Sequence, residues 1–423
     1  MFSSHTGRNL YGWPTFRTRT QAPLRMSPAL HFQAASGRQY MARRSTGCIG
    51  IEFDASGIAC AQAEFADGQW NARLDRYMQH PAASDASSES QPVTAAMLPV
   101  ASTDLLMLTA GANTPSVKCV LPMELCDLRV MYLPEAPPEE MRLLVQRELE
   151  SGGMRDPLFD FWTIPVEYST HHNLVPVNAI IGNPYAIGQV VSLFGDGGFS
   201  LNAIDTIPTA SARAVNIYRE AKRRLDPPAC HEDEYSLLNI VGTGSNSDAA
   251  AAIAVHAGWY GCTYTLVTHG IPMLARVPVR NGLRSLVQPL ASLLGMPQSD
   301  VLRMMRGLSR NLPVRASDRL LRTLVESCRN WAVNIAEEIL KTIAYSSRPG
   351  FRIVPSEIIV IGPGSIVPGI AEILELEVNI ESFVWKICSS PDSAEGSSDI
   401  NMVPMVWGES AVALALSASQ EIQ

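Results

Sequence analysis

The chain of 423 residues lacks paired cysteines. Its eight cysteines are scattered singly, and no CxxC pair occurs. A tetrahedral zinc site and a redox-active dithiol both draw on such close pairs, so the sequence argues against both. We expect buried free thiols instead, as is usual for a protein of the reducing cytoplasm.

The sequence also has no apolar run long enough to span a bilayer, and no basic, apolar and cleavage regions in the order of an export signal. It has no HExxH or comparable set of histidines and carboxylates, so we predict no metal held by side chains alone. A formal net charge of −8 argues against a general nucleic-acid binder. These absences together favour a globular cytoplasmic protein.

Acidic residues are missing from residues 1–44, which hold seven arginines and several Ser, Thr and Pro residues. This stretch has no regular apolar period, so we predict a disordered basic tail over residues 1–45. Such a tail can contact anionic lipid or an acidic partner. An organelle transit peptide has a similar composition and is the other interpretation.

Strand and helix patterns alternate through the rest of the chain. Two strand pairs with tight turns, at residues 48–64 and 251–269, stand near the start of each half. A polar, proline-bearing stretch at residues 225–234 separates the halves, so we predict domains over residues 46–225 and 235–423. The repeated order predicts a duplicated α/β architecture with a cleft between the halves.

The apolar periods predict the individual elements. Strands are expected at residues 48–53, 58–64, 103–109, 116–122, 128–133, 159–166, 175–182, 201–206, 235–242, 251–256, 263–269, 273–279 and 358–361. Helices are expected at residues 137–150, 184–194, 210–223, 281–294, 298–309, 318–345, 367–374 and 408–418. Ser299 is expected to cap the helix at residues 298–309.

One stretch organises the second half, residues 357–374 (EIIVIGPGSIVPGIAEIL). An apolar strand runs into Gly362, Pro363 and Gly364, and a helix follows. Glycine has no Cβ, so such a turn lets the backbone approach a ligand above the sheet edge. An ordinary turn without a ligand is the alternative.

Six segments match, in order, the pattern of the actin-like superfamily, which includes Hsp70 and the sugar kinases. They are residues 48–62 (CIGIEFDASGIACAQ), 117–150, 198–215, 252–282, 357–374 and 408–418. More narrowly, the chain resembles the PilM family of type IV pilus assembly proteins, which is itself similar to FtsA. The resemblance implies two α/β domains about a nucleotide cleft, with a small subdomain inserted at about residues 115–167. It also implies a last helix that returns to the first domain.

By the same resemblance, the cleft would bind ATP and magnesium. Two hairpins would hold the phosphates and the metal, through residues matching Glu52, Asp54, Ser56, Gly57, His256, Gly258 and Thr263. The adenosine side would be formed by residues matching Glu338, Lys341, Gly362, Gly364 and Ser365. For Glu338 and Lys341, a solvated helix surface is the alternative.

The chain departs from the family where the chemistry matters. The two aspartates of the family fall on Glu52 and His256, and imidazole is a poor ligand for magnesium. A family glycine falls on Asp54, which puts a carboxylate near the phosphates. Trp259 and Tyr260 replace small hydroxyl residues, and their rings are expected to fill phosphate space. We therefore predict weakened or lost ATP and magnesium binding and no catalytic residue.

A second alignment of the later hairpin uses residues 239–248 (NIVGTGSNSD), which supply glycines and Asp248. This segment looks more like a phosphate loop, but its spacing to the strands that follow fits the family less well. The choice between the two alignments stays open at this point.

The resemblance implies a scaffold at the cytoplasmic face of the inner membrane, peripheral to it. Its partner would be the short cytoplasmic tail of a PilN-like membrane protein, docked near residues 117–150. Self-association is a further possibility. An active ATPase or kinase of the same superfamily is the alternative function, and a type II secretion platform is the alternative machine.

Overall fold

The computed structural model describes residues 45–54, 56–66, 69–79, 102–112, 114–165, 174–225, 251–278, 281–311, 317–347, 353–388 and 405–418. The predicted basic tail, the boundary between the halves and the strand at residues 235–242 lie outside these residues, apart from Ser45 and Leu225 at their ends. The alternative phosphate loop at residues 239–248 also lies outside them.

A five-stranded sheet, here the first sheet, has the order β3-β2-β1-β4-β8. β1 (Ser45–Asp54), β2 (Gly57–Ala66) and β3 (Gln69–Gln79) are antiparallel. β4 (Ser116–Leu121) and β8 (Ser200–Thr206) continue the sheet in parallel. Apolar residues of the inner strands are buried on both faces of the sheet, because helices cover both faces.

The second sheet repeats this plan, with the order β11-β10-β9-β12-β13. β9 (Ala251–Ala257), β10 (Cys262–Thr268) and β11 (Ile271–Arg276) are antiparallel. β12 (Pro355–Ile361) and β13 (Glu381–Val384) follow in parallel. Both sheets have three antiparallel strands followed by two parallel ones, which confirms the predicted duplication.

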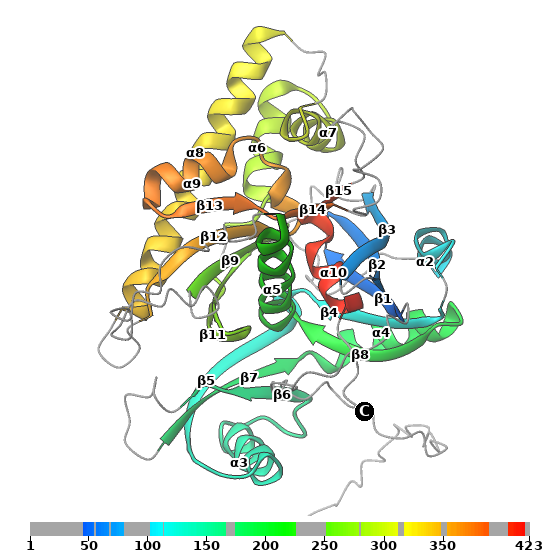
Figure 1. The fold of residues 1–423 in the computed structure, drawn as a ribbon, viewed down its shortest axis with the longest axis vertical. Helices are drawn as coiled ribbons and strands as arrows, with labels where there is room; N and C mark the ends of the chain where they lie inside the picture. Colours follow the sequence, from blue (N-terminus) through cyan, green and yellow to red (C-terminus); the bar gives the residue numbers. More distant parts are fainter. Residues whose placement is uncertain are drawn as a thin grey trace, which may run out of the picture.

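Two helices lie between the sheets, α5 (Ile207–Leu225) and α10 (Ala411–Ala418) (Figure 1). One apolar cluster joins them to Ala61 of the first sheet and Ala254 of the second. All eight residues of α10 are buried, and half of them are alanine, so the helix fits closely against its neighbours.

The outer faces of the two sheets carry further helices. α2 (Ser102–Thr109) and α4 (Pro184–Asp196) share an apolar cluster with the first sheet. The helices that share a cluster with the second sheet are α6 (Arg284–Leu294), α7 (Gln298–Ser309), α8 (Asp318–Ser346) and α9 (Ile370–Val378). The resulting layers alternate helix and sheet across the molecule (Figure 1).

A small three-stranded sheet with the order β5-β7-β6 is inserted between β4 and β8 in the chain. Its strands are β5 (Cys126–Pro134), β6 (Phe159–Thr163) and β7 (Leu174–Gly182), and α3 (Pro138–Ser151) packs on one face. This unit forms the lower part of the molecule in Figure 1.

Short elements complete the fold. They are the 3₁₀ turns η2 (Met123–Leu125), η4 (Pro363–Ile366) and η6 (Gly408–Ser410), and the strand pair β14 (Lys386–Cys388) and β15 (Met405–Trp407). Among the described residues, no helix is both long and apolar enough to cross a membrane.

Several local predictions were wrong. The strand expected at residues 103–109 is the helix α2, which buries Leu105 and Leu108 and exposes the two residues between them. Leucine and methionine favour helix, and a spacing of three suits one helix face. Ser299 does not cap α7, because Pro297 holds that position. The helix expected from residue 367 begins at Ile370, after the turn η4.

Candidate functional site

The turns after β1 and β9, here called the hairpin junction, meet directly. Asp54 Oδ2 accepts a hydrogen bond from the backbone N–H of Trp259 at 2.9 Å. Asp54 Oδ1 accepts from the N–H and the hydroxyl of Ser56, at 2.8 Å and 2.6 Å. Each oxygen of this carboxylate therefore already has protein donors. The ring of Trp259 packs in the core of the second sheet, so the backbone N–H, rather than the ring, faces Asp54.

Glu52 and His256 form a buried pair beneath the junction. His256 Nε2 lies 2.6 Å from Glu52 Oε1, and the side chains are 6% and 2% exposed. The two residues occupy matching places, because Glu52 pairs with Ala59 and His256 with Thr263, each seven positions later. Within the described residues, the structure therefore gives His256 the position that corresponds to Glu52.

The pair favours keeping a proton. Burial raises the pKa of Glu52, and the neighbouring imidazole offsets only part of that rise. Burial alone would lower the pKa of His256, but the carboxylates of Glu52, Asp54 and Glu124 together outweigh burial and raise it. Because both pKa values are raised, the carboxylate and the imidazole retain one proton between them. Glu52 Oε2 has no hydrogen-bond partner among the described residues.

Glu124, in the turn η2, is an acidic neighbour that the sequence analysis missed. Burial raises the pKa of its carboxyl to about 7, with Asp54 adding to the rise and His256 opposing it. Its Oε1 would lie 3.4 Å from a Cβ placed on Gly261. The residue follows β4 directly, and the signal available was its position after a parallel strand that ends at the same sheet edge as β1.

The glycines expected to face a ligand are in close contact with other atoms of the protein. A Cβ at Gly57 would lie 2.6 Å from the hydroxyl of Tyr77, and one at Gly258 would lie 2.9 Å from the carbonyl of Gly261. At Gly364 it would lie 2.5 Å from the Cβ of Ala257.

Gly362 has φ of 79° and ψ of −174°, a conformation that only glycine adopts readily. A Cβ there would also lie 2.8 Å from the imidazole of His256. Other atoms do approach these glycines closely, as predicted, but the atoms that do so are side-chain and backbone atoms of this chain.

The three hydroxyl residues of the predicted site are buried. Ser56 joins the hydroxyl of Tyr77 at 3.0 Å, and Thr263 lies in β10 opposite His256. Ser365 packs against Gly408, where a Cβ would lie 2.7 Å from its side chain.

The helix residues predicted for the adenosine side are not brought to the glycine turn. Glu338 binds Lys341 at 2.6 Å and Arg276 of β11 at 3.4 Å. The α8 residue that reaches the glycine turn is Trp331, whose ring would lie 3.1 Å from a Cβ at Gly364. Seven residues of α-helix separate Trp331 from Glu338, a rise of about 10 Å. A large aromatic residue on the buried face of this helix was the available signal.

The carboxylates that match the metal site of the family do not suit magnesium. Magnesium needs several open oxygen ligands in octahedral geometry, but both oxygens of Asp54 accept from protein donors and Glu52 Oε1 is paired with His256, which leaves, in these two carboxylates, only Oε2 of Glu52 without a partner among the described residues. No group of three or more His, Cys, Asp or Glu among the described residues could hold a metal ion. What this arrangement does is join the two hairpins to each other.

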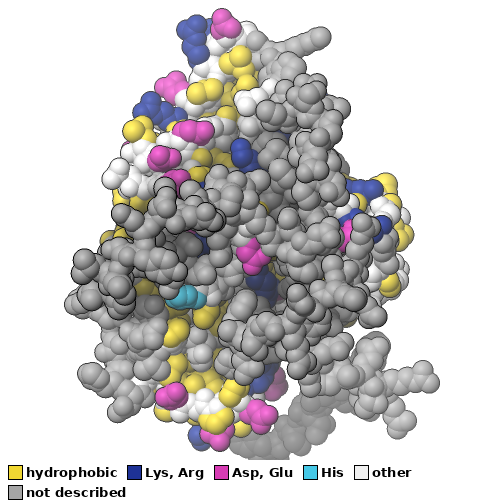
Figure 2. All heavy atoms as spheres, in the orientation of Figure 1, with side chains coloured by type: hydrophobic (Ala, Val, Ile, Leu, Met, Phe, Trp, Pro, Cys, Tyr) yellow, Lys and Arg dark blue, Asp and Glu magenta, His cyan; other side chains and the backbone are white. Residues whose placement is uncertain are grey.

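A second candidate surface lies on the inserted sheet. Met131 and Leu133 of β5 point toward α3, so the alternate residues Val130 and Tyr132 lie on the other face, 48% and 38% exposed. β5 is an edge strand of this sheet. Figure 2 shows hydrophobic side chains down the lower part of the visible face, in the region of β5 in Figure 1.

Two sheets of the same strand order, two helices between them and two facing hairpin turns define the actin-like fold. Comparison with solved structures agrees. A chain of the "PilM-PilN type IV pilus biogenesis complex" is similar over 88% of this chain and 97% of its own, with a TM-score of 0.61 and 16% sequence identity. At that identity the likeness establishes the fold, which is the PilM-type actin-like fold.

More distant structures add no evidence, because their TM-scores fall below 0.5. Ethanolamine utilization protein EutJ from Carboxydothermus hydrogenoformans is 11% identical, covers 88% of this chain and 90% of its own, and has a TM-score of 0.44. The cytoplasmic domain of EpsL, an inner-membrane component of the type II secretion system of Vibrio cholerae, is 9% identical. It covers 59% of this chain and 74% of its own, at a TM-score of 0.31. No protein-family model and no curated protein matches the sequence.

Proposed function

We propose that this protein is a PilM-like scaffold of a type IV pilus or related secretion assembly. It acts at the cytoplasmic face of the inner membrane, without crossing it, and holds the cytoplasmic tail of a PilN-like membrane protein. The observation that carries the proposal is the likeness to a chain of the PilM–PilN complex along nearly the full length of both chains. The alternative machine is a type II secretion platform.

The scaffold role does not depend on nucleotide. The hairpin junction is closed by Asp54 and Trp259, and the glycines on either side of it are in contact with protein atoms. A ligand would have to displace the buried pair of Glu52 and His256, which leaves at least one charge unpaired. These contacts favour a scaffold over an active ATPase or kinase.

The tail of the partner docks at β5 of the inserted sheet. An extended peptide can add to the outer edge of β5 through backbone hydrogen bonds and place alternate side chains on Val130 and Tyr132. Edge-strand addition suits a short tail, because backbone bonds supply affinity while a few apolar contacts supply selectivity.

Calorimetric titration tests this site, using the full chain and a synthetic peptide of the cytoplasmic segment of the PilN-like protein. Val130→Asp places a charge in the docking surface and is expected to weaken binding at least about tenfold, or 1.4 kcal/mol. Val325→Asp is the matched control, because Val325 is 52% exposed and lies on α8. Absence of binding by the unmodified chain, or equal affinities for the two variants, would contradict the proposal.

A further inference from the structure

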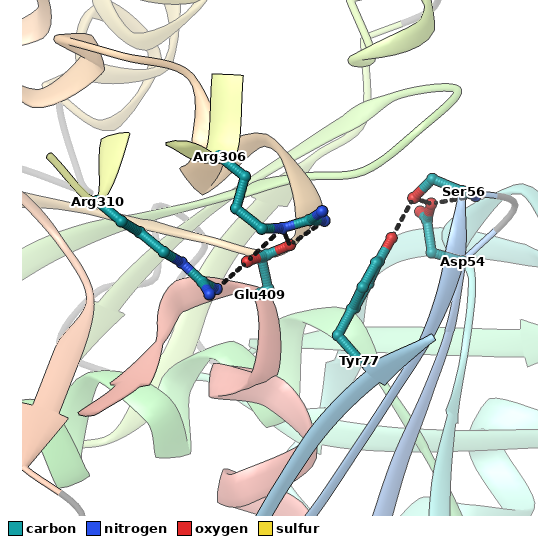
Figure 3. Close-up of polar contacts among 6 residues, drawn as sticks. All are labelled: Asp54, Ser56, Tyr77, Arg306, Arg310 and Glu409. Carbon is teal, nitrogen blue, oxygen red and sulfur yellow. Dashed lines mark hydrogen bonds and ion pairs between the residues drawn. The ribbon is translucent and has the colours of Figure 1, made fainter. Parts of the chain in front are cut away.

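A buried carboxylate holds two arginines beside the hairpin junction (Figure 3). Glu409 is 3% exposed and accepts from Arg306 Nε and Nη2 at 3.0 Å and 2.7 Å. Its other oxygen accepts from Arg310 Nη2 at 2.7 Å. Two-point binding by a guanidinium fixes geometry as well as charge.

These three residues connect α7 to the helix that lies between the sheets. Arg306 and Arg310 lie on and just after α7, which packs with the second sheet. Glu409 lies in η6, where the carbonyl of Gly408 accepts a hydrogen bond from the N–H of Gly362, and η6 leads directly into α10, which packs on both sheets. The ion pairs therefore tie α7 to α10, and the direct contact with the first sheet is made by Arg306 on Tyr77.

Arg306 also continues toward the hairpin junction. Its guanidinium lies 5.2 Å from the centre of the Tyr77 ring, and Tyr77 is on β3 of the first sheet. The hydroxyl of Ser56 donates to Asp54, so the hydroxyl of Tyr77 must donate to Ser56. Figure 3 shows the resulting line of side chains from α7 to the turn after β1.

From Asp54 the line returns to the second sheet through the N–H of Trp259. The contacts thus run from the second sheet to the first and back again. All of these groups belong to this chain, and Asp54 and Ser56 are among the residues that the resemblance assigns to the phosphates and the metal.

Arg306 stays charged and Tyr77 stays protonated at neutral pH, so the contacts that they make persist. Burial acts against the charged form of Arg306, but its bonds to Glu409 outweigh that effect and raise its pKa. Burial also raises the pKa of Tyr77, so its hydroxyl keeps the proton that it donates. Neither group changes charge near neutral pH.

We propose that Arg306, Arg310 and Glu409, continued by Tyr77 and Ser56, form a latch that holds the two sheets closed in place of a bound nucleotide. The inference rests on the nucleotide-independent scaffold proposed above, but not on the docking site at β5. A chain with such a latch keeps its two five-stranded sheets together without a ligand. The relative placement of the two halves is therefore the same with and without nucleotide.

Hydrogen–deuterium exchange of the full chain tests the latch. The double variant Arg306→Leu with Arg310→Leu is expected to speed exchange of the segments that contain Asp54, Trp259 and Gly408 at least tenfold, which corresponds to about 1.4 kcal/mol. Arg303→Leu is the matched control, because Arg303 lies on the same helix, is 78% exposed and pairs only locally with Asp300. The inserted sheet serves as an internal reference whose exchange should not change.

Milder variants keep the test decisive if the double variant fails to fold. Glu409→Gln keeps the shape and removes the charge, and it should speed exchange of the same segments. Tyr77→Phe removes one hydroxyl, so it should loosen the turn after β1 and leave α7 unchanged.

Exchange equal to that of Arg303→Leu at both turns would overturn the latch. An equal rise in the inserted sheet would also overturn it, because the effect would then be a loss of global stability. Peptide binding at β5 is measured separately, so loss of the docking site and failure of the latch give different results.

Discussion

A carboxylate and an imidazole, both almost fully buried, are the central residue-scale feature of the hairpin junction. Glu52 and His256 face each other at 2.6 Å, with Asp54 and Glu124 as the nearest further charges on the imidazole. A buried pair of this kind is stable only while both partners are present, because removing one leaves the other uncompensated, at about 3–5 kcal/mol.

The pair gives stability a pH dependence of known sign. The pKa values of Glu52 and His256 are both raised in the folded state, so the folded protein retains a proton that the unfolded chain releases as pH rises. This stabilisation is present below the unfolded histidine pKa of about 6.5 and is lost as pH rises through the folded value. Stability should therefore fall as pH rises.

Urea unfolding between about pH 6.5 and about pH 8 measures this effect. The free energy of unfolding of the chain that keeps the pair should decline by up to about 1.4 kcal/mol per pH unit more than that of E52Q/H256Q. Glu124 has a pKa of about 7 and is coupled to His256, so both proteins also carry Glu124→Gln, and the difference between them then isolates the pair. Parallel pH profiles for the two proteins would count against a shared proton.

At the scale of single elements, α10 depends on the absence of side chains beneath it. A Cβ at Gly50 of β1 would lie 1.8 Å from the carbonyl oxygen of Ala413. Backbone cannot move aside as a flexible side chain can, so the helix would have to leave its place between the sheets.

Gly50→Ala should therefore destabilise the protein, by about 3 kcal/mol or more, since even ordinary overpacking costs about 1–3 kcal/mol. Gly188→Ala is the matched control, because Gly188 is in α4 and a Cβ there would meet nothing within 4 Å. That change should stabilise by about 0.5–1 kcal/mol through helix propensity. Thermal unfolding should show a lower midpoint for Gly50→Ala and a higher midpoint for Gly188→Ala than for the unmodified chain.

Some elements could be predicted from the sequence and others could not, for physical reasons. The hairpins and the long helix α8 carry strong periods, so their presence was predicted correctly. β3 was missed because it is an edge strand with exposed polar residues such as Arg73 and Asp75, and lacks a continuous apolar pattern.

The resemblance assigned Glu52 and His256 to the two aspartates of one metal site, and the structure brings these residues together. The latch could not be predicted, because its ion pairs join residues about a hundred positions apart on elements with no shared pattern. Charge pairs at such separations depend on how whole elements pack, which a local period does not encode.

At the scale of the whole molecule, the two sheets are held in a closed arrangement by the protein alone. A ligand that binds only the folded state adds stability, about 2.7 kcal/mol at a hundred times its dissociation constant. In the scaffold that we propose, the hairpin junction is filled by protein groups, so we expect ATP and magnesium to add no such stability.

Thermal unfolding with and without millimolar ATP and magnesium should give the same midpoint, within about 1 °C. ATP without magnesium controls for general effects of the anion. A clear rise in the midpoint that needs both ATP and magnesium would show that the junction opens to admit nucleotide, and the protein would then be a nucleotide-switched assembly factor.

The position of α10 also bears on how the protein is made. The hydroxyl of Ser417 bonds the carbonyl of Cys48, 369 residues earlier, and α10 covers the inner face of the first sheet. During synthesis, that sheet leaves the ribosome long before the helix that completes it. The helix α5 covers part of that face at once, but the part under α10 stays uncovered, so we expect the first half to depend on chaperones until α10 is made.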